Sequence, residues 1–418
     1  MKNFPLSHDA LVQLTKKFPT PFYLYDEKAI RENMREFTKA FSIFENFREH
    51  FAVKALPNPY ILKILLDEGA GADCSSLPEL MLCNLVGMRD VIFTSNNTPA
   101  EEFRFAYEHG AIINLDDITH ISFLENALDG KFPETICFRY NPGKEKSGGN
   151  AFIGKPEEAK YGLTKAQIFS AYKECKARGV KHFGLHTMLA SNELNVEFFF
   201  DTAKILFDLC VELYKELKIK MDFVDLGGGV GIPYKPNEKK IDWNELAYGI
   251  KKIYDEKISA NGLAPLSIFW ECGRPITGPY GYLVTKAIHE KNIYRNYIGV
   301  DASMADLMRP GMYGAYHEIF VSGKEAVEKN HVYDVVGSLC ENCDKFAIAR
   351  ALPKIEMGDL LVICDAGAHG RAMGFNYNGK LRCGELLLRC DGSVKEIRRR
   401  ETIDDYFATL DLDGVKNF

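Results

Sequence analysis

The sequence predicts an α/β protein made of a (β/α)8 TIM barrel followed by a C-terminal mostly-β domain. Three observations predict it. The chain has 418 residues, enough for two units or for one barrel with an appendage. Eight short strand-like runs alternate with helix-like segments over roughly 250 residues, which is the repeat count and size of such a barrel. After Pro279 the helix-like segments become rare and turn-rich strands follow one another.

The eight expected strands are short runs rich in apolar and β-branched residues. They lie at 50–55, 70–76, 90–95, 111–116, 135–141, 182–188, 222–229 and 267–274. Helical spacing fits the segments between them: PYILKILLDEG at 59–69 repeats apolar residues at intervals of three and four, and 197–217 form a long amphipathic run. The alternation of the two patterns predicts parallel strands joined by helices.

Three segments are expected along the chain. Residues 1–30, which include the strand-like TPFYLYD, precede the barrel strands and are expected to pack with the β domain. Residues 31–279 form the cofactor-binding barrel. Residues 280–418 form the β domain, with strand-like runs such as GYLVTKAIHEK, DLLVICDAG and GELLLRCDG.

Composition narrows the class of protein. The net charge of -6 is mild and excludes a general nucleic-acid or anionic-membrane binder, because those need a basic face. The start, MKNFPLSHDALVQL, lacks the unbroken apolar core of a signal peptide, and no segment has the length to span a bilayer. Eleven scattered cysteines fit reduced thiols better than a disulfide framework. We therefore expect a cytoplasmic protein.

Two glycine-containing loops follow the last two expected barrel strands. In such barrels a phosphate commonly sits on the loops after strands seven and eight. Here these loops are GGGVG at 227–231 and CGRP at 272–275. Glycines let backbone N–H groups approach a phosphate, and Arg274 adds a cation. A glycine turn alone has a purely structural explanation, but the placement of both loops favours an anion site.

Lys54, in the stretch FAVKALPN, ends the first expected barrel strand and so points into the same barrel mouth. Most lysines at strand ends are merely solvated. A lysine beside a phosphate cradle, however, is what pyridoxal phosphate requires: an amine for a Schiff base and a grip on its phosphate. Glu271, at the end of the eighth strand, is the candidate partner of the pyridine nitrogen. A carboxylate there makes the ring a strong electron sink, which suits decarboxylation.

Several motifs then show a family resemblance. The chain resembles the diaminopimelate decarboxylases, members of the alanine-racemase-like (fold type III) pyridoxal-phosphate decarboxylases. The similarity runs nearly end to end through FAVKA, KYGL at 160–163, DLGGGVGIPY, ECGRP, DLMRPGMYGAYHEI, GSLCEN, DAGAHGRAMGFNYN and IRRRETIDDY. The DLMRPGMYGAYHEI segment is similar to the diaminopimelate branch in particular.

The resemblance implies roles for individual residues. Lys54 would carry the cofactor as a Schiff base, and Glu271 would hold its pyridine nitrogen. Further positions expected at the cofactor are His186, Ser191, Gly228, Gly229, Gly273, Arg274 and Tyr377. Arg274, Arg309, Tyr313 and Glu341 match substrate-binding positions. Cys340 and Glu341 match a pair that the second subunit of a homodimer inserts into the active site, with Cys340 acting in proton return; no metal is implied.

Two positions depart from the family pattern. Where the family has a histidine stacked on the pyridine ring, two residues beyond His186, this chain has Met188. Either the Met188 thioether packs on the ring, or His186 is redirected to do so. The second departure is His369, in place of a tyrosine that touches the cofactor phosphate and the substrate. A histidine still donates to phosphate, and Tyr377 is a candidate to compensate.

Alternatives to this interpretation remain open. CENC at 340–343 is also a redox or zinc pattern, but no second ligand pair of standard spacing accompanies it, and Cys343 is interpreted as a packed thiol. The leading hypothesis is decarboxylation of meso-2,6-diaminopimelate to L-lysine. The nearest rival is a decarboxylase of D-lysine, D-ornithine or L-ornithine on the same fold. A rival from another class is a non-catalytic regulatory homologue.

Overall fold

The computed structural model describes residues 4–146 and 155–416. The chain divides into two compact units, and each is described by itself. The barrel unit comprises Arg31–Pro233 and Asn237–Ile276, and the β-rich unit comprises Met1–Ile30, Tyr234–Pro236 and Thr277–Phe418. The predicted fold class is confirmed, because the first unit contains a closed barrel of eight parallel strands and the second a mixed sheet.

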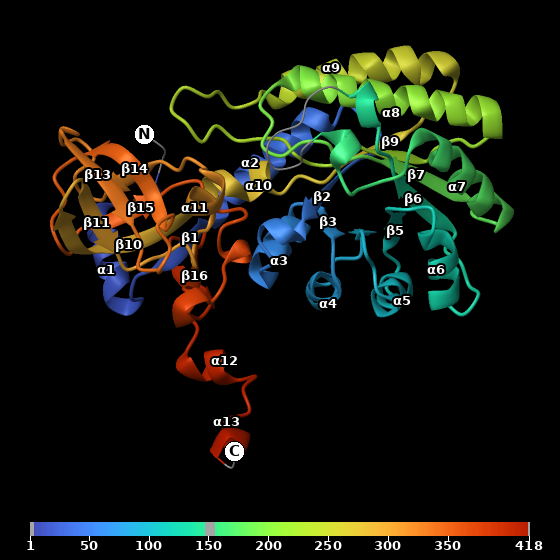
Figure 1. The fold of residues 1–418 in the computed structure, drawn as a ribbon. Helices are drawn as coiled ribbons and strands as arrows, with labels where there is room; N and C mark the ends of the chain where they lie inside the picture. The colour runs from blue at the N-terminus through green and yellow to red at the C-terminus, as the bar shows by residue number, and fades with distance from the viewer. Residues whose placement is uncertain (1–3, 147–154, 417–418) are drawn as a thin grey trace. The chain divides into compact units, whose positions relative to one another are not determined.

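Eight strands close the barrel in chain order, each hydrogen-bonded to the next and the last to the first (Figure 1). They are β2 (Phe47–Ala52), β3 (Gly71–Cys74), β4 (Val91–Thr94), β5 (Ile112–Leu115), β6 (Thr135–Arg139), β7 (His182–His186), β8 (Phe223–Asp225) and β9 (Ser267–Trp270). Seven of them lie within the expected runs and are shorter, because the polar and glycine residues at the run ends form the loops of the barrel mouth. The first strand, β2, is as long as its expected run but begins three residues earlier and ends at Ala52, so that Lys54 follows it.

Helices lie outside the barrel (Figure 1): the first of them precedes the first barrel strand, and the others each follow a strand. They are α2 (Glu27–Phe41), α3 (Pro59–Asp67), α4 (Leu77–Val86), α5 (Ala100–Glu108), α6 (His120–Ala127), α7 (Lys165–Ala177), α8 (Val196–Leu217), α9 (Trp243–Lys257) and the short α10 (Arg274–Thr277).

The start of α3 shows how the sequence sets one of these boundaries. The Asn58 side chain accepts a hydrogen bond from the N–H of Tyr60, and Pro59 occupies the first helical position, where its missing N–H costs nothing. Ile61 and Leu65 then turn toward the core. The Leu-Pro-Asn turn therefore ends the strand and turn that carry Lys54 and begins the next helix.

The β-rich unit contains a nine-stranded mixed sheet (Figure 1). Its strands are β1 (Phe22–Asp26), β10 (Gly281–Asn292), β11 (Asn296–Val300), β12 (Ile319–Val321), β13 (His331–Val336), β14 (Lys345–Leu352), β15 (Leu360–Ile363), β16 (Gly384–Leu388) and β17 (Val394–Arg398). The main path runs β14-β13-β11-β10-β1-β16-β17, and β15 pairs with both β10 and β12. Its helices are α1 (His8–Lys17), α11 (Arg309–Tyr313), α12 (Ile403–Phe407) and α13 (Leu412–Lys416).

The N-terminal strand β1 lies inside this sheet, antiparallel to β10 and parallel to β16. Alternate residues of the strands face one core, as a period of two requires: Phe22 and Leu24 of β1 share a cluster with Tyr282 and Val284 of β10. β1 comes before the barrel strands in the sequence, whereas β10 and β16 come after them. β1 is thus hydrogen-bonded on both sides by strands from the far end of the chain.

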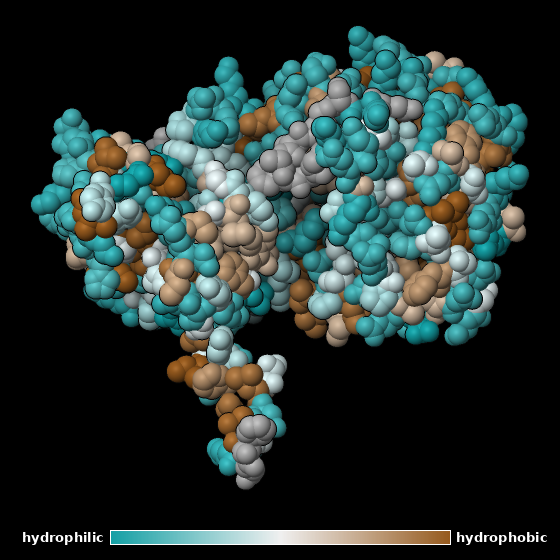
Figure 2. All heavy atoms as spheres, viewed as in Figure 1, coloured by the Kyte–Doolittle hydropathy of each residue, from teal (hydrophilic) through white to brown (hydrophobic). Residues whose placement is uncertain are grey.

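The C-terminal segment beyond β17 exposes apolar side chains. Ile403, Leu410, Leu412 and Val415 are each about half exposed or more, and apolar surface gathers on α12 and α13 (Figure 2). No helix within residues 4–146 and 155–416 combines the length and apolar character that crossing a bilayer demands.

Gly184 of β7 offers a test of barrel packing. A β-carbon there would overlap the Phe223 ring, which stacks on Phe269 with ring centroids 4.6 Å apart. Gly184→Ala is therefore expected to lower the free energy of unfolding by about 1–3 kcal/mol, measured by urea denaturation. Gly299→Ala is the matched control, since a β-carbon at this strand position comes no closer than 3.4 Å to its neighbours. Equal stability of the two variants would contradict the packing described.

Candidate active site

Polar and charged side chains gather where the barrel strands end. Because the strands are parallel, the residues at their carboxyl ends meet at one mouth of the barrel. Asp73, Asn114, His186 and Asp225 lie at or beside the ends of β3, β5, β7 and β8, and all four are at least 98% buried. Lys54 follows β2 in a single turn of 3-10 helix, and Glu271 follows β9 directly.

Lys54 makes an ion pair with Asp73, Nζ to Oδ2, at 3.2 Å. The lysine side chain is about half exposed (47%), whereas Asp73 is fully buried. The Asp73 carboxylate raises the pKa of Lys54, against the opposing effect of desolvation. Burial, together with the charge of Glu271, raises the pKa of Asp73. The amine is thus held at the mouth by a buried carboxyl and stays accessible.

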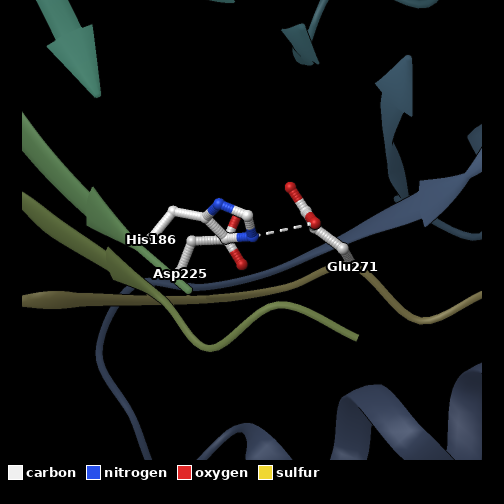
Figure 3. A group of neighbouring side chains, drawn as sticks. All are labelled: His186, Asp225 and Glu271. Carbon is white, nitrogen blue, oxygen red and sulfur yellow. Dashed lines mark ion pairs between the residues drawn. The ribbon is translucent and has the colours of Figure 1, made fainter. Parts of the chain in front are cut away.

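Glu271 lies beside His186 and Asp225 (Figure 3). His186 Nε2 is 3.2 Å from Glu271 Oε2, and one ligand atom of each of the three residues lies within 4.8 Å of the others. Burial alone would raise the pKa of Glu271, but His186 and Lys54 hold it below its ordinary value. Burial and the Glu271 charge raise the pKa of Asp225 well above its ordinary value. The arrangement therefore favours negative charge on Glu271 over negative charge on Asp225.

Three atoms of this cluster make no hydrogen bond to the described residues. They are His186 Nε2, Asp225 Oδ2 and Glu271 Oε1, all fully buried. A buried carboxylate oxygen without a donor is costly, so such an atom in a native site indicates a ligand or water that satisfies it. Glu271 thus presents an acceptor ready for an N–H group inside the barrel mouth.

The glycine loop after β8 lies against two neighbouring segments. A β-carbon at Gly228 would overlap the carbonyl oxygen of Glu271, and one at Gly229 that of Ala190. Gly229 also has φ +89°, a left-handed conformation that disfavours side chains. The Glu271 N–H donates to the Gly227 carbonyl at 2.8 Å. Only glycine permits this close approach, which packs the two predicted phosphate loops together.

The remaining barrel residues of the predicted site lie near these loops. Arg274 Nη2 is 3.4 Å from Ser191 Oγ, so the two predicted phosphate ligands lie together. A β-carbon at Gly273 would come within 2.6 Å of that of Ala55, one residue after Lys54. Met188 Sδ accepts the Gly228 N–H at 3.1 Å, which places its thioether on the glycine loop. His186 is buried and contacts Glu271 through its ring edge.

The other predicted residues belong to the β-rich unit. Arg309, 5% exposed, donates from Nη1 to the Tyr234 hydroxyl at 2.7 Å and lies 3.1 Å from His317 Nε2. Its guanidinium also stacks over the Tyr234 ring at 4.6 Å. His317 is therefore more than an ordinary core histidine, because it helps to fix Arg309. Tyr313, on α11, is 44% exposed.

Cys340 and Glu341 are exposed on the same β-rich unit. The Cys340 N–H donates to Asn378 Oδ1 at 2.8 Å, and Glu341 raises the pKa of the neighbouring Tyr377 phenol through its charge and a hydrogen bond. Cys343 is also exposed, so its interpretation as a packed thiol is wrong. His369 adopts φ +53° within its glycine-rich turn. In the described part of the chain, the cluster suited to a metal is His186, Asp225 and Glu271, not the cysteines.

The sequence interpretation missed three residues of the barrel mouth, Asp73, Asn114 and Asp225, and, in the β-rich unit, the Arg309 partner Tyr234. Asp73 and Asp225 sit in expected strands, where a lone aspartate looks like a strand end. Their signal was available, since a charged residue inside a run that is otherwise buried requires a partner. Asn114 and Tyr234 carried no such signal.

Comparison with known proteins decides the family. Residues 27–278 match the family described as "Pyridoxal-dependent decarboxylase, pyridoxal binding domain". The chain belongs to this family. Protein TabA of Pseudomonas amygdali pv. tabaci is 41% identical over 99% of this chain and 96% of its own. The diaminopimelate decarboxylase of Methanothermobacter thermautotrophicus is 35% identical over 94% of this chain and 92% of its own.

A solved structure agrees in fold. The crystal structure of the diaminopimelate decarboxylase from M. jannaschii has a TM-score of 0.88, and the structure of its complex with L-lysine has one of 0.87. Each is 30% identical and covers 96% of this chain and 94% of that one. The resemblance read from the motifs is therefore confirmed, and the protein is a pyridoxal-phosphate-dependent decarboxylase.

The barrel mouth fits this cofactor. The barrel mouth offers the accessible amine of Lys54, the Glu271 Oε1 as an acceptor for a ring N–H, and a loop whose backbone is not covered by side chains at Gly228 and Gly229. Pyridoxal phosphate requires groups of these three kinds, for its aldehyde, its pyridine nitrogen and its phosphate.

Gly228→Ala tests whether cofactor binding requires the glycine loop to lie directly against Glu271. Since the new β-carbon would overlap the Glu271 carbonyl, the loops must separate, and the affinity for pyridoxal phosphate is expected to fall about tenfold or more. Titration of the apoprotein by absorbance or fluorescence measures it. The strand variant Gly299→Ala should bind the cofactor like the parent. Unchanged affinity in Gly228→Ala would contradict the close approach.

Asp73→Asn tests the ion pair of Lys54. Since Asp73 raises the pKa of Lys54, its removal lowers that pKa, so the neutral, nucleophilic amine persists to lower pH. The pH midpoint for capture of pyridoxal phosphate by the apoprotein is expected to fall by about one unit. Stopped-flow absorbance measures it, with Asp116→Asn as control, since buried Asp116 pairs instead with Arg139 at 3.4 Å. A midpoint that stays in place, or moves equally in the control, would refute the assignment.

Proposed function

We propose that the protein decarboxylates meso-2,6-diaminopimelate to L-lysine and carbon dioxide, the last step of lysine biosynthesis. The observation that carries the proposal is the barrel mouth, where an accessible lysine amine and an ionised, buried glutamate share one site with a glycine loop. Similarity to diaminopimelate decarboxylases over nearly the whole chain supports this substrate.

Bound pyridoxal phosphate supplies an electron sink for the pair of electrons that carbon dioxide leaves behind. Lys54 would hold the cofactor covalently, and Asp73 would orient its amine. Glu271 would accept the pyridine N–H, and its negative charge would keep that nitrogen protonated. Gly228, Gly229, Gly273, Ser191 and Arg274 would bind the phosphate, and the Met188 thioether, already on the glycine loop, is the group placed to cover the ring.

Arg309 is the proposed ligand of the substrate carboxylate that is not lost. Guanidinium binds carboxylate through two parallel hydrogen bonds, and a buried, fixed arginine loses little entropy in doing so. Tyr234 and His317 hold Arg309 through one of its terminal nitrogens. Tyr313, exposed on the same short helix α11, would assist. A monocarboxylate such as lysine or ornithine would leave this ligand unused.

We also propose that the active form is a homodimer in which each subunit supplies Cys340 and Glu341 to the other. Both residues are exposed, as such an exchange requires. The apolar surface of α12 and α13 is of the kind that association covers (Figure 2). Cys340 would return a proton to the carbon that loses carbon dioxide. A cytoplasmic location and the absence of nucleic-acid partners fit a reduced, mildly acidic protein.

The rival substrates predict different products. Purified protein with pyridoxal phosphate, incubated separately with meso-diaminopimelate, L-lysine, D-lysine and ornithine, is expected to form lysine from the first alone, as identified by mass. A diamine from any of the others would assign the protein to the basic amino-acid decarboxylases. Capture of no cofactor and turnover of no substrate would favour the regulatory homologue.

Arg309→Ala should raise KM for meso-diaminopimelate about 10- to 100-fold, because a charged hydrogen-bonded contact worth roughly 1.5–3 kcal/mol is lost. Arg350→Ala is the matched control: this arginine also stacks over a tyrosine, Tyr316, and its Nη1 donates to the His317 carbonyl at 2.9 Å. Steady-state kinetics and thermal melting separate binding from folding. An unchanged KM in Arg309→Ala, with normal melting, would remove Arg309 from substrate binding.

A further inference from the structure

The buried cluster around Glu271 includes a fourth residue that no family motif above contains. Asn114 Nδ2 lies 2.7 Å from His186 Nδ1 and 3.1 Å from Thr94 Oγ1. Asn114 is 2% exposed and His186 is 1% exposed, so water does not compete for these contacts. The chain of contacts runs Thr94–Asn114–His186–Glu271 across β4, β5, β7 and the segment after β9.

This chain of contacts fixes where the proton of His186 lies. With the Asn114 amide oriented so that its nitrogen faces His186, that nitrogen has only hydrogens to offer, and the ring nitrogen opposite it, Nδ1, is the acceptor. A neutral imidazole then carries its proton on Nε2, the nitrogen 3.2 Å from Glu271 Oε2. The N–H does not point straight at that oxygen, and the contact is electrostatic rather than a linear hydrogen bond.

The position of this proton influences which of two neighbouring carboxyl groups, Asp225 or Glu271, carries the negative charge. Asp225 and Glu271 lie too close together to be ionised at once in a buried site. Asp225 accepts one hydrogen bond, from the N–H of Gly227 at 2.8 Å. Glu271 faces the Nε2–H of His186, while Lys54, Asp73 on β3 and Glu49 on β2 are the other ionisable groups whose fields reach the cluster. The positive edge of the ring therefore favours negative charge on Glu271.

We propose that Asn114 and His186 are positioning residues that keep Glu271, rather than Asp225, as the ionised carboxyl at the pyridine-nitrogen end of the cofactor site. The inference rests on the proposed contact between Glu271 and the cofactor nitrogen. In this role His186 acts beside Glu271 and does not stack on the face of the pyridine ring. The same tautomer argues against a metal at His186, Asp225 and Glu271, since a protonated Nε2 has no lone pair to donate.

Two substitutions of His186 separate this role from packing. His186→Gln places an amide N–H near the position of Nε2, whereas His186→Leu fills the space without a donor. We expect His186→Leu to weaken binding of pyridoxal phosphate and to lower kcat about 10- to 100-fold, with KM nearly unchanged, because a contact to a charged group is lost. His186→Gln should recover most of both losses.

His50 supplies the matched control. It is also fully buried in the barrel and faces a carboxylate, with Nε2 3.1 Å from Asp90 Oδ1, but Asp90 precedes β4 and lies at the opposite end of the strands. His50→Leu and His50→Gln should bind the cofactor alike. The positioning role is refuted if His186→Leu and His186→Gln also bind pyridoxal phosphate equally well. It is refuted too if His50→Leu binds it more weakly than His50→Gln.

The tautomer is measured directly in the apoprotein. In protein labelled with 15N-histidine, the His186 resonances, assigned by their loss in His186→Gln, should show an unprotonated Nδ1 and a protonated Nε2. Asn114→Leu should abolish this preference, whereas Thr94→Val should preserve it, since Thr94 contacts only the far side of the amide. A proton on Nδ1, alone or in a doubly protonated ring, would overturn the proposal.

These readouts do not depend on the substrate. Resonances of the apoprotein and titration with pyridoxal phosphate need no amino acid, so a failure to decarboxylate meso-diaminopimelate would leave them intact. Conversely, normal turnover in His186→Leu would refute the positioning role and leave the proposed function standing.

Discussion

The barrel mouth depends on one electrostatic constraint, the burial of several carboxyl groups in a small volume with few cations. Glu49, Asp73, Asp225 and Glu271 are all at most 6% exposed. Burial raises the pKa of the first three, while Glu271 alone is held below its ordinary value. Since buried charges are tolerated only when paired, the positions of Lys54 and His186 determine which carboxyl carries the charge.

This constraint links fold to chemistry. Parallel strands bring their carboxyl ends to one mouth of the barrel. Groups separated by some 200 residues in the sequence therefore lie within a few ångströms of one another. The glycines after β8 allow the loop to lie on the Glu271 carbonyl, and the backbone bond from Glu271 to Gly227 holds that position. A side chain at Gly228 would move Glu271 and the loop together. The glycine loop proposed to bind the phosphate and Glu271, proposed to bind the pyridine nitrogen, thus pack directly against each other.

Much of this was predictable from the sequence. The eight strands followed from apolar runs between turn residues, and Lys54 and Glu271 stood out as charged residues at the ends of such runs. What sequence reasoning missed are relations between elements: that Asn114 of β5 reaches His186 of β7, or that Tyr234, next to Pro233 and Lys235 in a long loop, meets Arg309. Those contacts depend on strand register and loop path, which composition does not encode.

The most direct test of the account is to find the lysine that carries the cofactor. The holoprotein would be reduced with borohydride, digested and analysed by mass spectrometry for the peptide that carries the pyridoxyl group. The account predicts modification of Lys54 in the peptide containing FAVKALPN. Modification of another lysine, or of none, would contradict it, because the arrangement of Asp73, Glu271 and the glycine loop would then surround an amine that does not bind the cofactor.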